Sequence, residues 1–204
     1  MKKTIIFDVD GTLVNTHDGI IHTIEEVLET YGLSYDGDYD LWIGPPVKNS
    51  FMKFFGFSEE RAEETTRFYR KLYIDKYIIE SYLYPGIRET LKELKQRNFR
   101  LAVATMKTAP QVDKLFSFLG IQHFFEKVKT AREDGSLSKA QMISDLEEGY
   151  DEVYMIGDTD GDRVAAVAVG CHFIGVTYGF GYHRGEKYDF TTADSPADIL
   201  TMFK

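Results

Sequence analysis

Four carboxylates stand in two short segments of the chain at spacings that suit metal binding. Asp8 and Asp10 are separated by one residue in the segment FDVDGT, and Asp158 and Asp162 by three residues in GDTDGD. Carboxylates held close together raise one another's pKa, and a bound divalent cation removes this conflict. Oxygen ligands from two or three aspartates, completed by water and phosphate, are those that Mg²⁺ prefers. The two segments therefore predict one magnesium site that also receives a phosphate group.

A threonine and a lysine have the chemistry to complete such a site. Thr105 ends the apolar run that begins at Leu101, and Lys139 lies in the first turn of a helix that Ser138 is expected to cap. The chain as a whole is acidic, because 24 lysines and arginines against 33 aspartates and glutamates give a net charge of −9. Lys139 and Mg²⁺ would together supply the local positive charge that a dianionic phosphate needs.

The pattern of apolar residues predicts elements that bring these side chains to one edge of a sheet. Strands are expected at residues 4–9, 100–104, 125–130, 152–156 and 172–176, with helices at 87–97, 111–119, 138–147 and 163–169. Helices and strands that alternate with short connections build a doubly wound parallel α/β sheet covered on both faces. Ligands bind beyond the carboxyl ends of such strands. Asp8, Thr105 and Asp158 stand at or just beyond these ends, so they are expected to converge.

About 70 residues with only helical periodicity separate the first predicted strand from the others. We expect residues 1–15 and 83–204 to form an α/β core domain, and residues 16–82 to form a small helical domain inserted into it. Within the insertion, Trp42 and Lys48 lie on either side of the segment IGPP and are candidates for contacting a substrate. The alternative is that this segment only braces the insertion by packing.

Taken in chain order, these motifs resemble those of the haloacid dehalogenase-like (HAD) superfamily in its phosphatase branch. FDVDGT is similar to the first motif of that superfamily, Thr105 to the second, Lys139 to the third, and the GDxxxD pattern of Asp158 and Asp162 to the fourth. The resemblance implies a Rossmann-like core, with the helical insertion as a cap domain. The segments IGPPVKNSF, YPGI and IGVTYGFG resemble more narrowly phosphoglycolate phosphatases and 5′-nucleotidase-like members.

The resemblance implies a Mg²⁺-dependent phosphatase that works through an aspartyl-phosphate. Asp8 would attack the phosphorus, while Asp10 would protonate the leaving oxygen and then take a proton from water. Mg²⁺ would bind Asp8, the backbone carbonyl of Asp10, Asp158 and, directly or through water, Asp162. Lys139 would neutralise charge on the nucleophile and the phosphoryl group. The substrate is implied to be a small phosphorylated metabolite such as phosphoglycolate or a nucleotide.

The resemblance also implies which residues form the substrate site. Thr105 and the backbone amides that follow the first aspartate, including those of Gly11 and Thr12, would hold phosphate oxygens. Met106 stands where close relatives often have a small hydroxyl residue, so it belongs to the predicted substrate pocket. Lys48 of the insertion is the candidate for substrate binding from the cap.

Other functions fit parts of the same pattern. A phosphomutase of the β-phosphoglucomutase type would return the phosphoryl group to a sugar instead of passing it to water. A receiver-like signalling module also pairs an acidic Mg²⁺ pocket with a phosphorylated aspartate, but the helical insertion and Asp10 argue against it. Asp162 has an alternative role as a cap of the helix that follows it. Gly179 and Gly181 are expected in a loop, because their spacing does not match a dinucleotide-binding fingerprint.

Composition limits the partners and the location of the protein. A net charge of −9 without a cluster of basic residues repels nucleic acid and anionic lipid. No apolar stretch reaches the roughly 18 residues that a membrane span needs. One cysteine, Cys171, excludes an intramolecular disulfide. We therefore expect a cytoplasmic protein, monomeric or homodimeric, that binds neither nucleic acid nor membranes.

Overall fold

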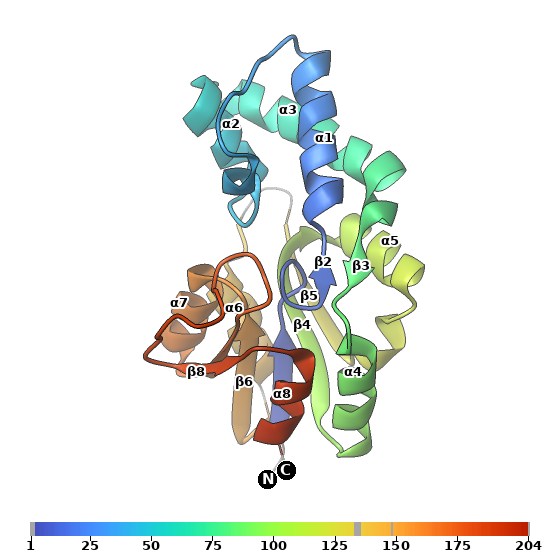
Figure 1. The fold of residues 1–204 in the computed structure, drawn as a ribbon, viewed down its shortest axis with the longest axis vertical. Helices are drawn as coiled ribbons and strands as arrows, with labels where there is room; N and C mark the ends of the chain where they lie inside the picture. The colour runs from blue at the N-terminus through green and yellow to red at the C-terminus, as the bar shows by residue number, and fades with distance from the viewer. Residues whose placement is uncertain (1–2, 133–135, 148, 204) are drawn as a thin grey trace. The chain divides into compact units, whose positions relative to one another are not determined.

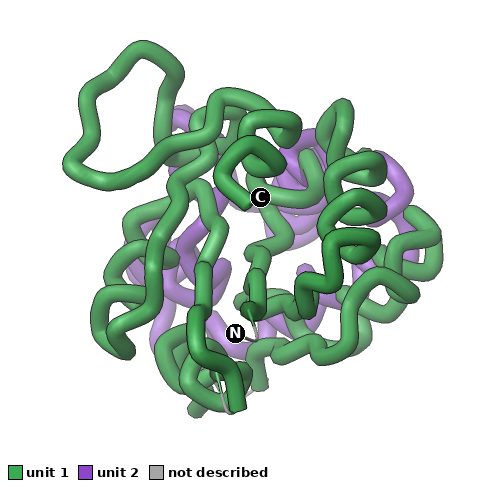
Figure 2. The backbone as a smooth tube through the Cα atoms, turned by 90° about the horizontal axis from the view of Figure 1, so that it is seen from below, with its two compact units in different colours: residues 1–15, 82–204 green, residues 16–81 purple. Residues whose placement is uncertain are grey.

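The chain folds into two compact units. The computed structural model describes residues 3–132, 136–147 and 149–203. The core unit comprises Met1–Asn15 and Tyr82–Lys204, and the insert unit comprises Thr16–Ser81 (Figure 2). Each unit has its own arrangement of elements and its own buried residues.

A short ladder in the core unit joins the chain segments that lead into and out of the insert unit. Its strands are β2 (Val14–Asn15) and β3 (Tyr82–Leu83), which pair antiparallel with Asn15 opposite Tyr82. The sequence pattern assigns Tyr82 to the insertion. Its backbone pairing with Asn15 instead places Tyr82 in the core unit.

The core unit is built on a six-stranded sheet in which every strand runs parallel to its neighbours. From edge to edge the strands are β5 (Lys127–Ala131), β4 (Arg100–Thr108), β1 (Lys3–Phe7), β6 (Glu152–Gly157), β7 (His172–Val176) and β8 (Thr191–Ala193) (Figure 1). The predicted parallel α/β sheet is thus confirmed, although β4 continues to Thr108. β8 is not predicted, because its three residues include two threonines and form no apolar run.

Helices cover both faces of the sheet because the chain visits the strands in two directions. α4 (Ile87–Gln96) and α5 (Ala109–Leu119) lead to β4 and β5, whereas α6 (Lys139–Glu147) and α7 (Asp160–Val169) lead to β6 and β7 (Figure 1). Right-handed crossovers in opposite directions place the two pairs on opposite faces. α8 (Pro196–Met202) packs beside α4, and a 3₁₀ turn (Gln122–Phe124) precedes β5. The direction reverses at β1, and ligands bind beyond the carboxyl ends of the strands at such a point.

One buried cluster connects the core-unit elements that carry predicted site residues. Ile6 of β1, Ala102 of β4 and Met155 of β6 pack with Met142 of α6 and Ala166 of α7. Well-packed interiors permit little movement of their side chains. The ends of these five elements are therefore held on a common rigid base.

The insert unit is helical, as its periodicity predicts. Its helices are α1 (His17–Thr30), α2 (Val47–Phe55) and α3 (Glu59–Leu72), with short 3₁₀ or π turns at Tyr39–Trp42, Tyr73–Tyr77 and Ile78–Glu80. Ser58 begins α3, because its Oγ accepts a hydrogen bond from the Arg61 amide at 3.3 Å. Within the described part of the chain, no helix of either unit is long and apolar enough to cross a membrane.

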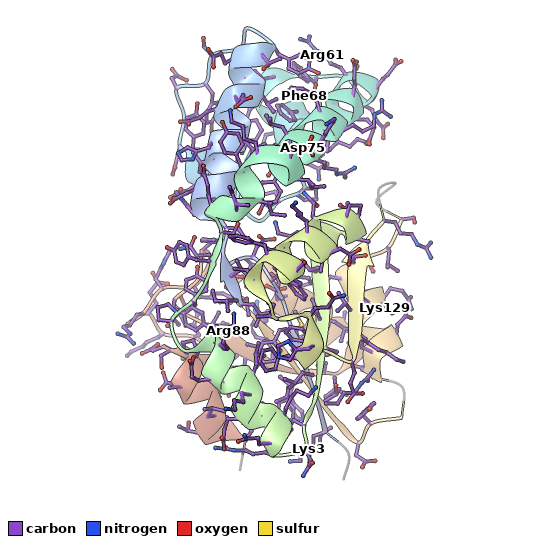
Figure 3. All side chains as sticks on the ribbon, turned by 90° about the vertical axis from the view of Figure 1, so that its right-hand side faces the viewer. Lys3, Arg61, Phe68, Asp75, Arg88 and Lys129 are labelled. Atoms are coloured by element: carbon purple, nitrogen blue, oxygen red, sulfur yellow. The ribbon has the colours of Figure 1, made fainter. Side chains whose placement is uncertain are left out.

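Aromatic side chains form the interior of the insert unit. The Trp42 side chain is buried, and its ring lies 5.1 Å from the rings of Phe51 and Phe54. Phe68 of α3, labelled in Figure 3, packs edge-on against Tyr31 at 5.8 Å and links α3 to the end of α1. The burial of Trp42 favours the packing role that was the alternative to substrate contact.

Candidate active site

Asp8 and Asp10 lie in a tight loop that directly follows the central strand β1. The Asp8 amide donates a hydrogen bond to the Ile156 carbonyl of β6 at 2.9 Å, so the sheet continues for one more residue. The Val9 carbonyl accepts hydrogen bonds from the amides of Thr12, Leu13 and Val14. Gly11 adopts a φ of +72°, a conformation that favours glycine. These bonds fix the backbone on both sides of Asp10.

Three of the predicted metal ligands come together from three different elements. Asp8 beyond β1, Asp158 beyond β6 and Asp162 of α7 each offer a carboxylate oxygen, and these oxygens lie within 4.8 Å of one another. All three residues are buried. Lys139, in the first turn of α6, donates to Asp8 Oδ1 at 2.8 Å and also to Asp162 Oδ1. This group of three aspartates, called the acidic cluster below, could bind a metal ion.

Charge in the acidic cluster is unbalanced, because one ammonium faces three carboxylates. Burial raises the pKa of Asp8 to about 8, against the opposing effect of the Lys139 ammonium. Burial and the neighbouring Asp162 raise the pKa of Asp158 to about 7. Burial disfavours the charged form of Lys139, yet Asp162 and Asp8 raise the pKa of its ammonium above the ordinary range. A divalent cation would compensate the excess negative charge, and a donor set made of oxygens fits Mg²⁺.

Asp162 has both of the roles that its position in the sequence allows. Its Oδ2 accepts hydrogen bonds from the Thr159 amide at 3.1 Å and the Thr159 hydroxyl at 2.8 Å, which caps the start of α7. Its Oδ1 accepts from Lys139. Capping and membership of the acidic cluster are therefore compatible, because they use different oxygens of one carboxylate.

The loop between β7 and β8 fixes Asp158. Asp158 Oδ2 accepts a hydrogen bond from the Phe180 amide at 2.8 Å, and Oδ1 accepts from Thr12 Oγ1 at 3.3 Å. The Tyr182 amide donates to the Asp158 carbonyl at 3.1 Å, and the Tyr178 hydroxyl donates to the Thr12 carbonyl at 3.1 Å. Residue types do not reveal this role, because the bonds to Asp158 from this loop come from backbone amides.

Gly11 and Thr12 shape the loop after β1 through hydrogen bonds that their amides donate within it. The Gly11 amide donates to the Val14 carbonyl at 2.9 Å, and the Thr12 amide donates to the Val9 carbonyl at 3.3 Å. The Thr12 hydroxyl is bonded to Asp158. Both amide hydrogens are thus used within the loop, and contact of Gly11 and Thr12 with a phosphate stays a prediction.

The end of β4 buries two polar side chains and exposes one apolar side chain. Its register with β5 shifts between Thr105 and Thr108, as at a β-bulge. Thr105 is buried, and its Oγ1 accepts a hydrogen bond from the Lys107 amide at 3.2 Å, whereas Met106 is 40% exposed. Lys107 is also buried, and its Nζ lies 2.8 Å from Asp10 Oδ1. Lys107 is not among the residues predicted for this site, and lysines are seldom buried in proteins.

Lys48 belongs to the insert unit and not to the core unit that holds the other predicted site residues. Its Nζ lies 3.0 Å from Glu59 Oε1 and 3.4 Å from Glu63 Oε2. These ion pairs link the start of α2 to α3. Contact of Lys48 with a substrate stays a prediction.

Glycines allow other backbone segments to approach the buried aspartates. A Cβ atom at Gly11 would overlap the Asp158 carboxylate, and one at Gly157 would overlap the Asp162 side chain. A Cβ atom at Gly179 would overlap both the Gly11 carbonyl and Asp158. The acidic cluster therefore depends on positions that have no side chain.

Gly11→Ala is expected to lower the free energy of unfolding by about 2 kcal/mol more than the same substitution at Gly120. Gly120→Ala is the matched control, because Gly120 has a φ of +63° but a Cβ atom there would have nothing within 4 Å. The control should lose only the roughly 1–2 kcal/mol of a left-handed alanine. Urea unfolding measures both losses, and equal values would show that the overlap with Asp158 has no energetic effect.

Comparison with known proteins matches nearly all of the core elements to one family. The model of the haloacid dehalogenase-like hydrolase family matches residues 5–176 of the chain. The matched range contains the acidic cluster, Lys139, Thr105 and Lys107. The match therefore covers every residue of the candidate site in the core unit.

Individual relatives match over most of both chains. A 5′-nucleotidase of Pseudomonas aeruginosa is 32% identical over 184 residues, which cover 87% of this chain and 83% of that protein. Pyrophosphatase PpaX of Halalkalibacterium halodurans is 34% identical over 203 residues, which cover 91% of this chain and 87% of that protein. The crystal structure of a predicted phosphatase from Clostridium acetobutylicum matches with a TM-score of 0.86 and 29% identity, covering 99% of this chain and 97% of that one.

Proposed function

Because the chain belongs to the haloacid dehalogenase-like hydrolase family and is a phosphatase of that family, we propose that it hydrolyses small phosphomonoesters with Mg²⁺ through an aspartyl-phosphate on Asp8. The main support is the buried acidic cluster, together with the hydrogen bond that Lys139 donates to its member Asp8. A carboxylate nucleophile divides hydrolysis into two easier steps. Phosphoryl transfer otherwise depends on positioning and on the stabilisation of charge.

The metal would be held by residues of three loops or helix ends. We assign it to the carboxylates of Asp8, Asp158 and Asp162, together with the backbone carbonyl of Asp10. When bound, Mg²⁺ would supply positive charge that stabilises the negative charge on the phosphoryl oxygens. Burial, with a smaller effect of the neighbouring carboxylates, raises the pKa of Asp8 to about 8 and that of Asp158 to about 7, so a bound cation would favour the charged forms that the site otherwise disfavours.

The reaction would proceed in two half-reactions. In the first, an Asp8 oxygen attacks the phosphorus, the bond to the ester oxygen breaks, and the Asp10 carboxyl gives its proton to that oxygen, which leaves as an alcohol. In the second, the Asp10 carboxylate takes a proton from water, and the water oxygen bonds to the phosphorus while the bond to Asp8 breaks. Phosphate is released, and both aspartates return to their starting states.

Other residues would orient the nucleophile and the phosphoryl group. Lys139 donates to Asp8 Oδ1 at 2.8 Å, which fixes the nucleophilic carboxylate and offsets its charge. Thr105 lies in the second half of β4. We propose that its hydroxyl binds a phosphate oxygen. Met106, which is 40% exposed, and Lys48 of the insert unit are assigned to the substrate side of the site. The insert unit takes the role of a cap in this proposal.

The substrate class follows from the residues and from the activities in the relatives' names. We propose phosphoglycolate, a nucleoside monophosphate or a similar small phosphomonoester. The test is a panel of such esters with an aryl phosphate, assayed for inorganic phosphate with and without Mg²⁺. We expect Mg²⁺-dependent release from at least one class. Transfer of the phosphoryl group to a sugar hydroxyl would favour a phosphomutase, and a stable phosphorylated protein without turnover would favour a receiver-like module.

A further inference from the structure

We propose that Lys107 is a positioning residue that holds the acid–base group Asp10 in place. This role rests on the proposed function, because it concerns the proton that Asp10 gives to the leaving oxygen. Lys107 Nζ lies 2.8 Å from Asp10 Oδ1, and both residues belong to the core unit. Lys107 closes the segment ATMK, whose threonine has a proposed task while the lysine has none so far.

Burial distinguishes this ion pair from an ordinary surface pair. The Lys107 side chain is 7% exposed and the Asp10 side chain 23%. The pair of Lys129, labelled in Figure 3, with Asp145 has the same length of 2.8 Å, but its side chains are 36% and 34% exposed. Exposed pairs contribute little, whereas separating a buried ammonium from its carboxylate leaves an uncompensated charge. Lys107 therefore keeps its contact with Asp10 more strictly than Lys129 keeps its contact with Asp145.

The backbone of Lys107 is fixed on both sides. Its amide donates to Thr105 Oγ1 at 3.2 Å. The next residue, Thr108, precedes α5, and its amide and hydroxyl donate to Gln111 Oε1 at 2.9 and 3.0 Å. The register shift between Thr105 and Thr108 takes Met106 and Lys107 out of regular pairing with β5. Bulges of this kind redirect side chains beside active sites, so the lysine extends from a rigid point.

The ion pair determines which Asp10 oxygen handles the proton. Lys107 Nζ lies against Oδ1, so the proposal assigns the proton transfer to the other carboxylate oxygen, Oδ2. In the first half-reaction this proton passes from Oδ2 to the leaving oxygen, and the ammonium stabilises the carboxylate that remains. In the second, a proton from water returns to Oδ2. Lys107 transfers no proton in this scheme and forms or breaks no covalent bond, so it acts only through the position and charge of Asp10.

The leaving group determines how much this positioning matters. An alkoxide is a poor leaving group and needs a proton from Asp10, whereas 2,4-dinitrophenolate leaves readily without one. General acid catalysis contributes about 10²–10⁴-fold, and a displacement of about 1 Å can remove about 10²-fold of rate. Loss of Lys107 should therefore slow the first half-reaction selectively with alkyl phosphates, because the second half-reaction is the same for both esters.

The test compares variants on an alkyl phosphate that the wild type hydrolyses and on 2,4-dinitrophenyl phosphate, both with Mg²⁺. We expect Lys107→Met to lower kcat/KM, which reports the first half-reaction, on the alkyl phosphate by about 10²-fold and on the dinitrophenyl ester by less than about tenfold. Lys107→Arg keeps the positive charge and should recover part of the loss. Lys129→Met, which breaks the exposed pair of equal length, should leave both rates unchanged.

A double-mutant cycle with Asp10→Asn completes the test. Asp10→Asn should show the same bias toward the dinitrophenyl ester, and adding Lys107→Met should cost little more, because residues that act together are not additive. Equal losses on both esters with a raised KM would make Lys107 a phosphate-binding residue and would overturn the inference. Equal losses with a lowered unfolding temperature would also overturn it. A wild type that releases phosphate from neither ester would instead refute the proposed function.

Discussion

Replacing Asp8 with asparagine is expected to lower kcat for phosphomonoester hydrolysis by at least about 10³-fold. The exchange keeps the size of the side chain but removes the charged oxygen that would attack phosphorus. Lys139 would keep a hydrogen-bond acceptor at this position, because the asparagine carbonyl can replace Asp8 Oδ1. Release of inorganic phosphate at saturating substrate and Mg²⁺ measures the loss, and mass spectrometry should find no phosphorylated protein.

Asp160→Asn is the matched control for this prediction. Asp160 lies beside the acidic cluster in the sequence, but its carboxylate accepts hydrogen bonds from Arg163 and from the Tyr182 hydroxyl. Its side chain is exposed, and it is not a member of the cluster. The control should retain nearly all of the activity. Full activity of the Asp8→Asn protein would refute Asp8 as the nucleophile.

Saturating Mg²⁺ is expected to raise the thermal unfolding temperature by about 5–10 °C. A ligand that binds only the folded state adds about 2.7 kcal/mol at a hundred times its Kd. Each kcal/mol raises Tm by about 2–4 °C for a chain of this length. The members of the acidic cluster are distant in sequence and meet only in the folded chain. Thermal unfolding with Mg²⁺ and with EDTA measures the difference.

The stabilisation by Mg²⁺ should grow with pH. In the metal-free protein, the folded-state pKa is about 8 for Asp8 and about 7 for Asp158, above the ordinary value of 3.8. Between the ordinary and the raised values the folded state binds more protons than the unfolded state, so the free energy of unfolding falls as pH rises. Mg²⁺ binds the deprotonated carboxylates and should remove this loss.

Two variants distinguish stabilisation by Mg²⁺ bound at the acidic cluster from unspecific effects of the ion. Asp158→Asn should abolish most of the Mg²⁺-dependent rise in Tm, while Asp160→Asn should keep it. Asp8→Asn should also flatten the decline of metal-free stability with pH, because it removes the carboxyl with the higher of the two pKa values. An unchanged Tm of the wild type at saturating Mg²⁺ would contradict the assignment of the metal.

Sequence patterns predict the parallel sheet well, because a strand buried on both faces needs a continuous apolar run. Such runs identify β1, β4, β6 and β7 and leave only their ends uncertain, as at β4, where pairing resumes at Thr108 after a register shift. The edge strand β5 has no such run and is expected from the alternation of helices and strands. β8, with three residues, and the two-residue strands β2 and β3 are too short to carry a pattern. Their pairing depends on segments that are distant in the chain.

The candidate site is predictable where residue type carries the chemistry. Aspartates and a lysine at strand and helix ends identify Asp8, Asp158 and Lys139, since few other arrangements bury such charges together. The Phe180 amide is not predictable, because every residue except proline has a backbone N–H. Lys107 is missed for another reason, since only the irregular end of β4 turns its side chain toward Asp10.

The ladder of β2 and β3 lies at a point of the core unit where an inserted segment can be replaced by another during evolution. Asn15 and Tyr82 stand opposite one another, so the chain leaves the core unit and returns to it at adjacent points. Insertions are best tolerated where the ends of the interrupted segment lie close together. A different module, or a simple hairpin turn, could take the place of residues 16–81 without a change in strand order. Under the proposed function, the reactive groups of the core and the selectivity of the inserted module are thus free to be inherited separately.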